Sequence, residues 1–138
     1  MRRRLVRACL PFLILPMAAG CTSMGRETLG LGAGAPVSAG AAALGDGLIG
    51  RDKGSKLSSD ARMRALDAEY QALQFMPAGQ AVPWEAGSIK GSVVPTQLYR
   101  VGSQDCRGYS QTVVRDGREA KTLGTACRTE DGFWKPVA

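Results

Sequence analysis

The apolar residues between positions 57 and 75 follow a helical period. They recur at spacings of three and four, which is typical of an amphipathic helix, at Met63, Leu66, Tyr70 and Leu73. Ser58 and Ser59 stand just before Asp60 and can cap the start of this helix, because a serine oxygen accepts from the first free amides. The stretch therefore predicts one amphipathic helix. Its apolar stripe could dock a partner or a lipid surface, but we expect it to pack in the core against a sheet.

From residue 80 onward the pattern changes from helical to strand-like. Short runs rich in strand-forming residues alternate with turn residues, and we expect strands at 88–94 and 97–101 on either side of Pro95. Residues 84–87 read as a turn before the first strand. Together with the helix, this pattern predicts an α+β fold: one helix followed by a small antiparallel sheet built as a hairpin meander.

The centre of the predicted sheet is a hairpin around Asp116-Gly117. An Asp-Gly pair between two strand-like runs favours a two-residue type I′ turn, since both positions need a positive φ. With these two residues as the loop, paired residue numbers sum to 233, which sets Cys106 opposite Cys127. Counting from the turn makes this a non-hydrogen-bonded pair with Cα atoms about 4.5 Å apart, a separation that a disulfide accepts. The hairpin thus predicts a cross-strand disulfide.

A second Asp-Gly pair, Asp131-Gly132, predicts one more strand at the C-terminus. With two loop residues here too, paired numbers sum to 263 and Thr129 lies opposite Trp134. Because side chains alternate along a strand, these registers divide the sheet into two faces. The face on which we place the helix holds Val114, Leu123, the disulfide, Trp134 and Pro136. The other face is a candidate binding face and holds Tyr109, Phe133, Val113 and Val137.

The first twenty residues have the pattern of a signal peptide. Four arginines come before an unbroken apolar run from Ala8 to Ala19. Such a run is too short to span a bilayer, which takes about 20 residues in a helix. Ala18, Ala19 and Gly20 before Cys21 resemble the lipobox of bacterial lipoproteins, although Leu is usual where Ala18 stands. The resemblance implies cleavage before Cys21 and lipidation of its thiol. The alternative is an ordinary signal peptide that leaves Cys21 as a free thiol.

The four cysteines agree with the lipoprotein interpretation. Cys9 is lost with the signal peptide and Cys21 takes the lipid, so Cys106 and Cys127 remain as a pair for an oxidising compartment. Two acyl chains on one residue are enough for a stable membrane anchor. By analogy with lipoproteins, Thr22 rather than Asp favours sorting to the outer membrane. We therefore expect a lipid-anchored outer-membrane protein.

Charge changes the list of expected partners. The chain has 18 basic and 12 acidic residues, a formal net charge of +6, and the loss of four arginines with the signal peptide leaves 14 against 12. No cluster of Lys and Arg rises above scattered surface charge. We therefore expect a membrane partner through the anchor and a protein or other component of the envelope, and no nucleic acid.

Residues 21–56 are rich in Gly and Ala. Small residues recur at a spacing of four, as in glycine zippers that let helices approach closely in lipid, at Gly30, Gly34, Ser38, Ala42, Gly50 and Gly54. Pro36, Asp46 and the shortage of large apolar residues favour instead a flexible or disordered tether with partial helicity from Ala39 to Ile49. The expected organisation is a signal peptide at 1–20, this tether or zipper at 21–56, and a small domain at 57–138.

Residues suited to catalysis are few. The chain has no histidine, which excludes His-based triads and the usual zinc sites. Its carboxylates are scattered, and no Gly-rich phosphate loop follows a strand. The disulfide lacks a C-x-x-C spacing, which favours a structural role over the redox alternative. We expect no enzymatic activity, no cofactor and no metal site.

The C-terminal half resembles a known family on specific residues. Cys106 to Tyr109 (CRGY), Asp116-Gly117, Gly124 to Arg128 (GTACR) and Asp131 to Trp134 (DGFW) are similar to the C-terminal signature of the rickettsial-type 17-kilodalton surface antigen family. The stretch from Gly79 to Val94 also looks like that family's approach to the domain. The resemblance implies an outer-membrane lipoprotein with a glycine-zipper segment before a small domain, and it implies no established enzymatic activity.

Two functions fit these expectations. The first is a structural or interaction role in the cell envelope, in which an exposed face or edge of the sheet binds another envelope component. The second is a periplasmic inhibitor or ligand-binding module that uses the aromatic face around Tyr109 and Phe133.

Overall fold

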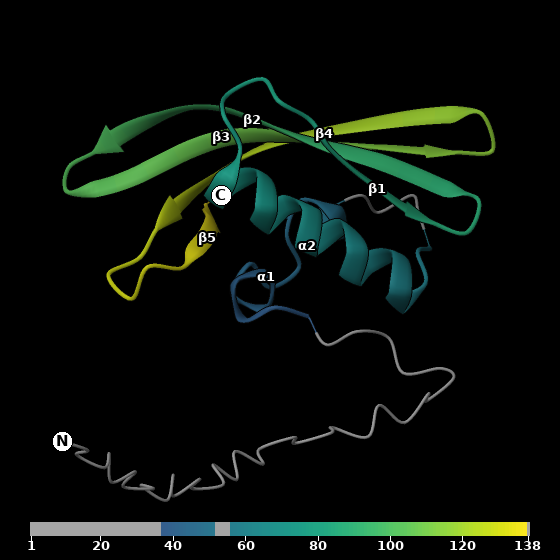
Figure 1. Cartoon of the computed structure of the whole chain (residues 1–138), viewed down its shortest axis with the longest axis horizontal. Coiled ribbons are helices and arrows are strands. Elements are labelled where there is room, and N and C mark those ends of the chain that lie inside the picture. The colour runs from purple at the N-terminus through teal and green to yellow at the C-terminus, as the bar shows by residue number, and fades with distance from the viewer. Residues whose placement is uncertain (1–36, 52–55, 138) are drawn as a thin grey trace, which may run out of the picture. The chain divides into compact units, whose positions relative to one another are not determined.

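A computed structural model describes residues 37–51 and 56–137. The predicted signal peptide, Cys21 and most of the predicted tether lie outside these residues. In sequence order, the described elements are α1 (Ala39–Ala43), the 3-10 helix η1 (Ile49–Arg51), α2 (Ser59–Phe75), β1 (Val82–Ala86), β2 (Ile89–Val101), β3 (Gln104–Arg115), β4 (Arg118–Arg128) and β5 (Trp134–Val137). The strands form one antiparallel sheet in the order β1-β2-β3-β4-β5, with α2 along one face (Figure 1). The predicted α+β meander is confirmed.

Helix α2 begins and ends where its local sequence requires. The Ser58 hydroxyl accepts a hydrogen bond from the Ala61 amide (3.2 Å), and Asp60 in the first turn suits the positive end of the helix dipole. Pro77 disfavours a helical conformation at the residue before it, so the chain leaves the helix in extended conformation at Met76. The buried face of α2 consists of Ala61, Ala65, Leu66, Ala68, Glu69, Ala72 and Leu73. The many alanines let the helix approach the sheet closely.

The C-terminal end of α2 is bound by Arg107 of β3. Its guanidinium donates to the carbonyl oxygens of Leu73 (2.9 Å), Met76 (2.9 Å) and Ala72 (3.3 Å), and to that of Thr96 in β2 (3.0 and 3.1 Å). The last carbonyls of a helix lack partners within the helix, and a positive charge there is favourable. Burial lowers the pKa of Arg107. Arg107 therefore fixes the end of α2 to the middle of the sheet.

The central hairpin forms as the sequence predicts. Asp116 and Gly117 have φ values of 49° and 73°, and Arg115 pairs with Arg118 across this two-residue turn. Cys106 lies opposite Cys127 with their Cα atoms 4.0 Å apart, and the two form the disulfide. The predicted disulfide and the register of β3 and β4 are confirmed.

The predicted register of the last strand is wrong by one residue. Arg128, not Thr129, pairs with Trp134. The Thr129 amide donates to the Phe133 carbonyl (2.8 Å), which leaves three loop residues instead of two, with Gly132 at φ 85°. Three-residue hairpin loops use this combination of a turn and a left-handed glycine, so an Asp-Gly pair fits both loop lengths.

The face that the helix covers also differs from the prediction. The one-residue shift in the register of β5 turns its side chains to the face opposite the predicted one, so Trp134 does not share a face with the disulfide. Trp134 is buried on the helix side, where its indole N–H donates to Gln74 of α2 (2.9 Å). Tyr109 and Val113 lie on this helix side as well, whereas Leu123 and the disulfide lie on the other.

The strands that precede the hairpin explain this choice of face. Register places Val93 and Val82 beside Gln111, and Trp84 beside Val113, so the helix side continues as an apolar surface across β2 and β1. The disulfide side has no equivalent apolar continuation. The helix therefore covers the face with the larger apolar area.

Two turns of the sheet differ from the prediction. Trp84 lies within β1, and the actual turn is Gly87-Ser88, with Ala86 opposite Ile89. A second Gly-Ser pair, Gly102-Ser103, joins β2 to β3. Both glycines have a φ of 61°, as the first position of a type II′ hairpin turn requires. Strand β2 continues through Pro95, with an irregular register between Pro95 and Leu98.

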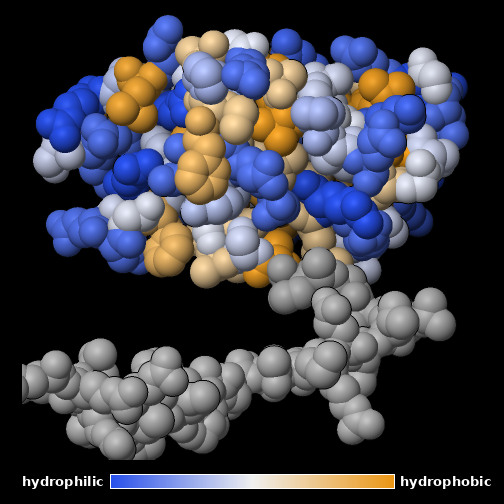
Figure 2. All heavy atoms as spheres, viewed as in Figure 1, coloured by the Kyte–Doolittle hydropathy of each residue, from blue (hydrophilic) through white to orange (hydrophobic). Residues whose placement is uncertain are grey.

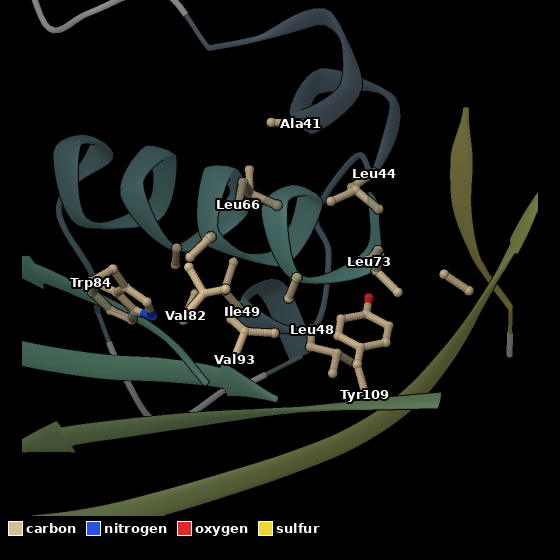
Figure 3. Close-up of a cluster of buried hydrophobic side chains, with 14 of the residues drawn as sticks. Ala41, Leu44, Leu48, Ile49, Leu66, Leu73, Val82, Trp84, Val93 and Tyr109 are labelled. Atoms are coloured by element: carbon tan, nitrogen blue, oxygen red, sulfur yellow. The ribbon is translucent and has the colours of Figure 1, made fainter. Parts of the chain in front are cut away.

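The glycine-rich segment before α2 belongs to the domain. Ala41, Leu44, Leu48 and Ile49 are buried in the hydrophobic core, and Figure 3 shows Leu48 and Ile49 between α2 and the sheet. The predicted boundary at residue 57 is therefore wrong, whereas the partial helicity expected between Ala39 and Ile49 is present as α1 and the start of η1. Within the described ranges, none of the helices combines the length and the hydropathy that crossing a membrane takes.

We predict that Arg107→Met destabilises the domain by about 3 kcal/mol, because the apolar stem is kept while the buried carbonyls at the end of α2 lose their donor. Urea unfolding of the purified chain measures this change. Arg118→Met, which replaces an exposed arginine at the start of β4, is the matched control and should change the free energy of unfolding by less than about 0.5 kcal/mol. Equal effects of the two substitutions would contradict the capping role of Arg107.

Candidate functional site

Glu69 of α2 is a fully buried carboxylate with three hydrogen-bond donors. Its Oε2 accepts from the Leu48 amide (2.9 Å) and its Oε1 from the Ile49 amide (2.9 Å). The Tyr109 hydroxyl of β3 also donates to Oε2 (3.2 Å), and Figure 3 shows this hydroxyl pointing toward α2. The carboxylate therefore joins α2, β3 and the segment around η1, three parts of the chain that are far apart in sequence.

Glycines let the segment before α2 come close to the helix. Gly47 has a φ of 59°, and a Cβ there would lie 2.5 Å from Glu69 Oε2. A Cβ on Gly40 would lie 2.1 Å from the Tyr70 ring. On β4, a Cβ on Gly124 would lie 2.5 Å from the Leu48 side chain. In the described part, Gly40 and Gly47 thus serve close packing against α2 within the domain.

Burial changes the ionisation of this cluster. Desolvation raises the pKa of Glu69 from 4.5 to about 7, although the amides of Leu48 and Ile49, the Tyr109 hydroxyl and the charge of Arg51 act in the opposite direction. The pKa of Tyr109 is raised as well, first by burial and then by the charge of Glu69. Because Glu69 has no exposed surface, it cannot contact a substrate in this conformation. Its role is to hold the segments together.

The candidate binding face predicted from Tyr109 and Phe133 does not exist as one surface. Tyr109 is only 2% exposed and faces α2. Phe133 is half-buried and precedes β5, and the corrected register turns it away from the helix side. Cys106 and Cys127 are joined as predicted, and Cys21 lies outside the described residues.

The side of the sheet that faces away from α2 carries exposed apolar residues around the disulfide. Leu123 is 71% exposed, Val101 56%, Tyr99 45% and Val137 40%. Tyr99 pairs with Cys106, and Leu123 is on the same face of β4 as Cys127, so all four share this side. We call these four residues the open sheet face.

A shallow hollow of about 530 Å³ lies at the open sheet face. The four apolar residues line it together with Gln104 and Arg51, whose guanidinium donates to the Val137 carbonyl (3.1 Å). The surface is mostly apolar, with one cation at its rim, which suits contact with another protein surface more than chemistry on a small substrate. In the side view of Figure 2, hydrophobic residues (orange) form separate small areas among hydrophilic ones (blue).

A second hollow, of about 410 Å³, lies between α2 and β1. Trp84 forms part of its lining, and the indole N–H has no acceptor among the described residues. The remaining lining includes both charges, from Arg64, Asp67 and Glu85. Within residues 37–51 and 56–137, no three Asp, Glu or Cys side chains are grouped as a metal site would require.

Sequence reasoning missed Glu69 and Arg107, although both carried a signal. Glu69 lies three residues after Leu66 and four before Leu73, on the apolar stripe of the predicted helix, where a carboxylate must be buried and therefore bonded. Arg107 is two residues before Tyr109 and points to the same side of β3, so only the correct choice of the covered face would have placed it next to the helix.

Comparison with known proteins finds relatives named 17 kDa surface antigen in Rickettsia species. The protein from Rickettsia bellii is 37% identical over 112 residues, which cover 78% of this chain and 70% of the relative. The protein from Rickettsia felis is 40% identical over 81 residues (56% and 50%), and that from Rickettsia prowazekii is 38% identical over 81 residues. No family model and no solved structure matches the chain.

The raised pKa of Glu69 predicts a pH-dependent stability. Between about pH 4.5 and 7 the folded state binds more protons at Glu69 than the unfolded state, so the free energy of unfolding should fall as the pH rises. The loss across this window should reach about 3 kcal/mol, since each pKa unit corresponds to about 1.4 kcal/mol. Urea unfolding at several pH values measures it. Glu69→Gln should flatten the profile in this window, and identical slopes for both proteins would contradict the assignment.

Proposed function

The chain belongs to the 17 kDa surface antigen family, and we propose that it is a lipid-anchored outer-membrane protein that binds another envelope component through its open sheet face. The name of its relatives, surface antigen, supports a location at the cell surface. The signal peptide and the lipobox-like residues before Cys21 support anchoring through that residue.

The observation that carries the binding role is the apolar character of the open sheet face. Four exposed apolar residues gather on one side of the sheet, and the disulfide lies among them. A cluster of exposed apolar side chains marks an interaction site more often than a single exposed apolar residue does. The disulfide and the Asp116-Gly117 turn hold the two central strands in a fixed register, so the surface is already formed before a partner arrives.

We propose a binding role rather than a catalytic one. In the described part of the chain, the carboxyl group with the strongly raised pKa is Glu69, and it is closed to solvent. The side chains at the open sheet face are apolar apart from Arg51 and Gln104 at its rim. These groups suit recognition of a surface, with Arg51 available to pair with an acidic group of the partner.

The anchor predicts an intact mass. Protein purified from membranes without reductant should have the mass of a chain that begins at Cys21 and carries acyl chains, and it should weigh two hydrogens less than its reduced form. A Cys21→Ala variant should lack the acyl mass and leave the membrane fraction, while its disulfide stays intact. An unacylated chain in the membrane fraction would contradict lipid anchoring.

The open sheet face predicts a position-dependent crosslink. A photo-crosslinking amino acid in place of Gln104, at the rim of the face, should capture a discrete partner in intact cells, whereas one in place of Gln71, on the exposed side of α2, should not. Leu123→Glu should lower the yield about tenfold by placing a charge in the contact. Leu98→Glu changes a similarly exposed leucine outside the face and is the matched control. Equal capture from both positions would contradict this binding site.

A further inference from the structure

The two edges of the sheet differ in what they offer to another strand. At the β1 edge, Ala86 and Ile89 flank a two-residue turn and form a hydrogen-bonded pair. Because hydrogen-bonded and non-hydrogen-bonded pairs alternate along the strand, the backbone groups of Pro83 and Glu85 point outward. Proline has no N–H to donate, which leaves one outward donor on this edge, at Glu85. The β1 edge is therefore a poor template for a new strand.

The other edge is open along the first half of β4. Strand β5 pairs only with Thr125–Arg128, and no strand within the described residues pairs with the outer side of 118–124. The short Cα separation of Cys106 and Cys127, 4.0 Å, marks a non-hydrogen-bonded pair. Alternation from that pair turns the N–H and C=O groups of Glu119, Lys121 and Leu123 away from β3. All three residues are exposed, so this edge presents a row of free donors and acceptors.

We propose that this edge pairs with the same edge of a second copy of this chain, antiparallel, about a two-fold axis at Ala120. Residues whose backbone N–H and C=O groups point away from β3 must pair with residues of the same kind in the second copy. An axis at Ala120 meets this condition and sets Glu119 opposite Lys121 of the second copy. The symmetry repeats this contact, so each interface gains two cross-strand pairs of opposite charge. Ala120 meets its own copy with small side chains that allow the close approach of a non-hydrogen-bonded pair.

The other registers of this edge are less favourable. An axis at Lys121 sets two lysines opposite each other, and an axis at Glu119 sets two glutamates opposite each other. An axis at Thr122 moves Glu119 onto Thr125, whose outer side already pairs with Val137. Charge and space thus select the axis at Ala120. The charges on this edge are complementary to the same edge of another copy. A different protein would not require such two-fold complementarity, so this feature favours a second copy as the partner.

This inference does not rest on the proposed function. The pairing uses the backbone of β4, shares only Leu123 with the open sheet face, and leaves Tyr99 and Val101 accessible. The two proposals can therefore fail separately. The mass of the protein crosslinked to position 104 shows whether the partner at the open sheet face is a second copy of this chain or a different protein.

Charge exchange tests the pairing. Sedimentation equilibrium of the full-length chain in detergent should show a monomer–dimer equilibrium. Glu119→Lys and Lys121→Glu should each raise the dissociation constant about tenfold, because each sets like charges opposite in both pairs. An equimolar mixture of the two variants should recover the wild-type constant, since every pair then has opposite charges. A monomer at all concentrations, or a dimer indifferent to both variants, would overturn the proposal.

Cysteine crosslinking tests the axis independently of charge. Ala120→Cys should form a disulfide between two copies, because Cα atoms of a non-hydrogen-bonded pair lie about 4.5 Å apart. Thr122→Cys on the same edge should not, since four residues of offset separate its two copies by about 13 Å. Peptide mapping under non-reducing conditions identifies the bond, and an intact Cys106–Cys127 disulfide with an unchanged circular dichroism spectrum shows that both variants are folded. Equal crosslinking at both positions would overturn the register.

Discussion

The buried carboxylate of Glu69 is the contact on which the rest of this domain depends. It accepts from two backbone amides of the segment around η1 and from the Tyr109 hydroxyl of the central strand β3. Each of those donors would lose its partner without it, and an unsatisfied buried donor costs about 1 to 3 kcal/mol. A carboxylate in this position is itself unfavourable to bury, which is why its pKa rises. The domain accepts that cost because one side chain satisfies three donors from two other segments.

Arg107 has the corresponding task at the end of α2. The helix is held in its middle by a carboxyl group that it supplies and at its C-terminus by a guanidinium group that the sheet supplies. Both contacts lie on the same side of β3, so the helix and the glycine-rich segment occupy one face of the sheet. In the described part of the chain, no helix covers the opposite face, and Arg51 reaches only its rim. This division explains why four apolar side chains around the disulfide are exposed, and why the binding surface that we propose is there.

Pairing that follows from a single turn could be predicted from the sequence, and contacts between separate elements could not. The Asp116-Gly117 turn fixed the register of β3 and β4 because turn type and strand pairing depend on adjacent residues alone. The register predicted from Asp131-Gly132 is wrong by one residue, because the same pair also suits a three-residue loop. The face covered by the helix depends on Trp84 and Val93, which lie in β1 and β2 and outside the central hairpin. Glu69 and its amide partners are about 20 residues apart, and no local pattern links them.

The glycine-rich segment shows how composition alone can mislead about domain limits. Gly and Ala suggest a flexible tether, because they form little core by themselves. Here the glycines allow Leu44, Leu48 and Ile49 to enter the core between them, close against a helix whose buried face is itself mostly alanine. A domain of this size has little apolar surface to bury, so added side chains and a disulfide both matter to its stability. The same small residues that lower the local preference for structure therefore make the close packing of this segment possible.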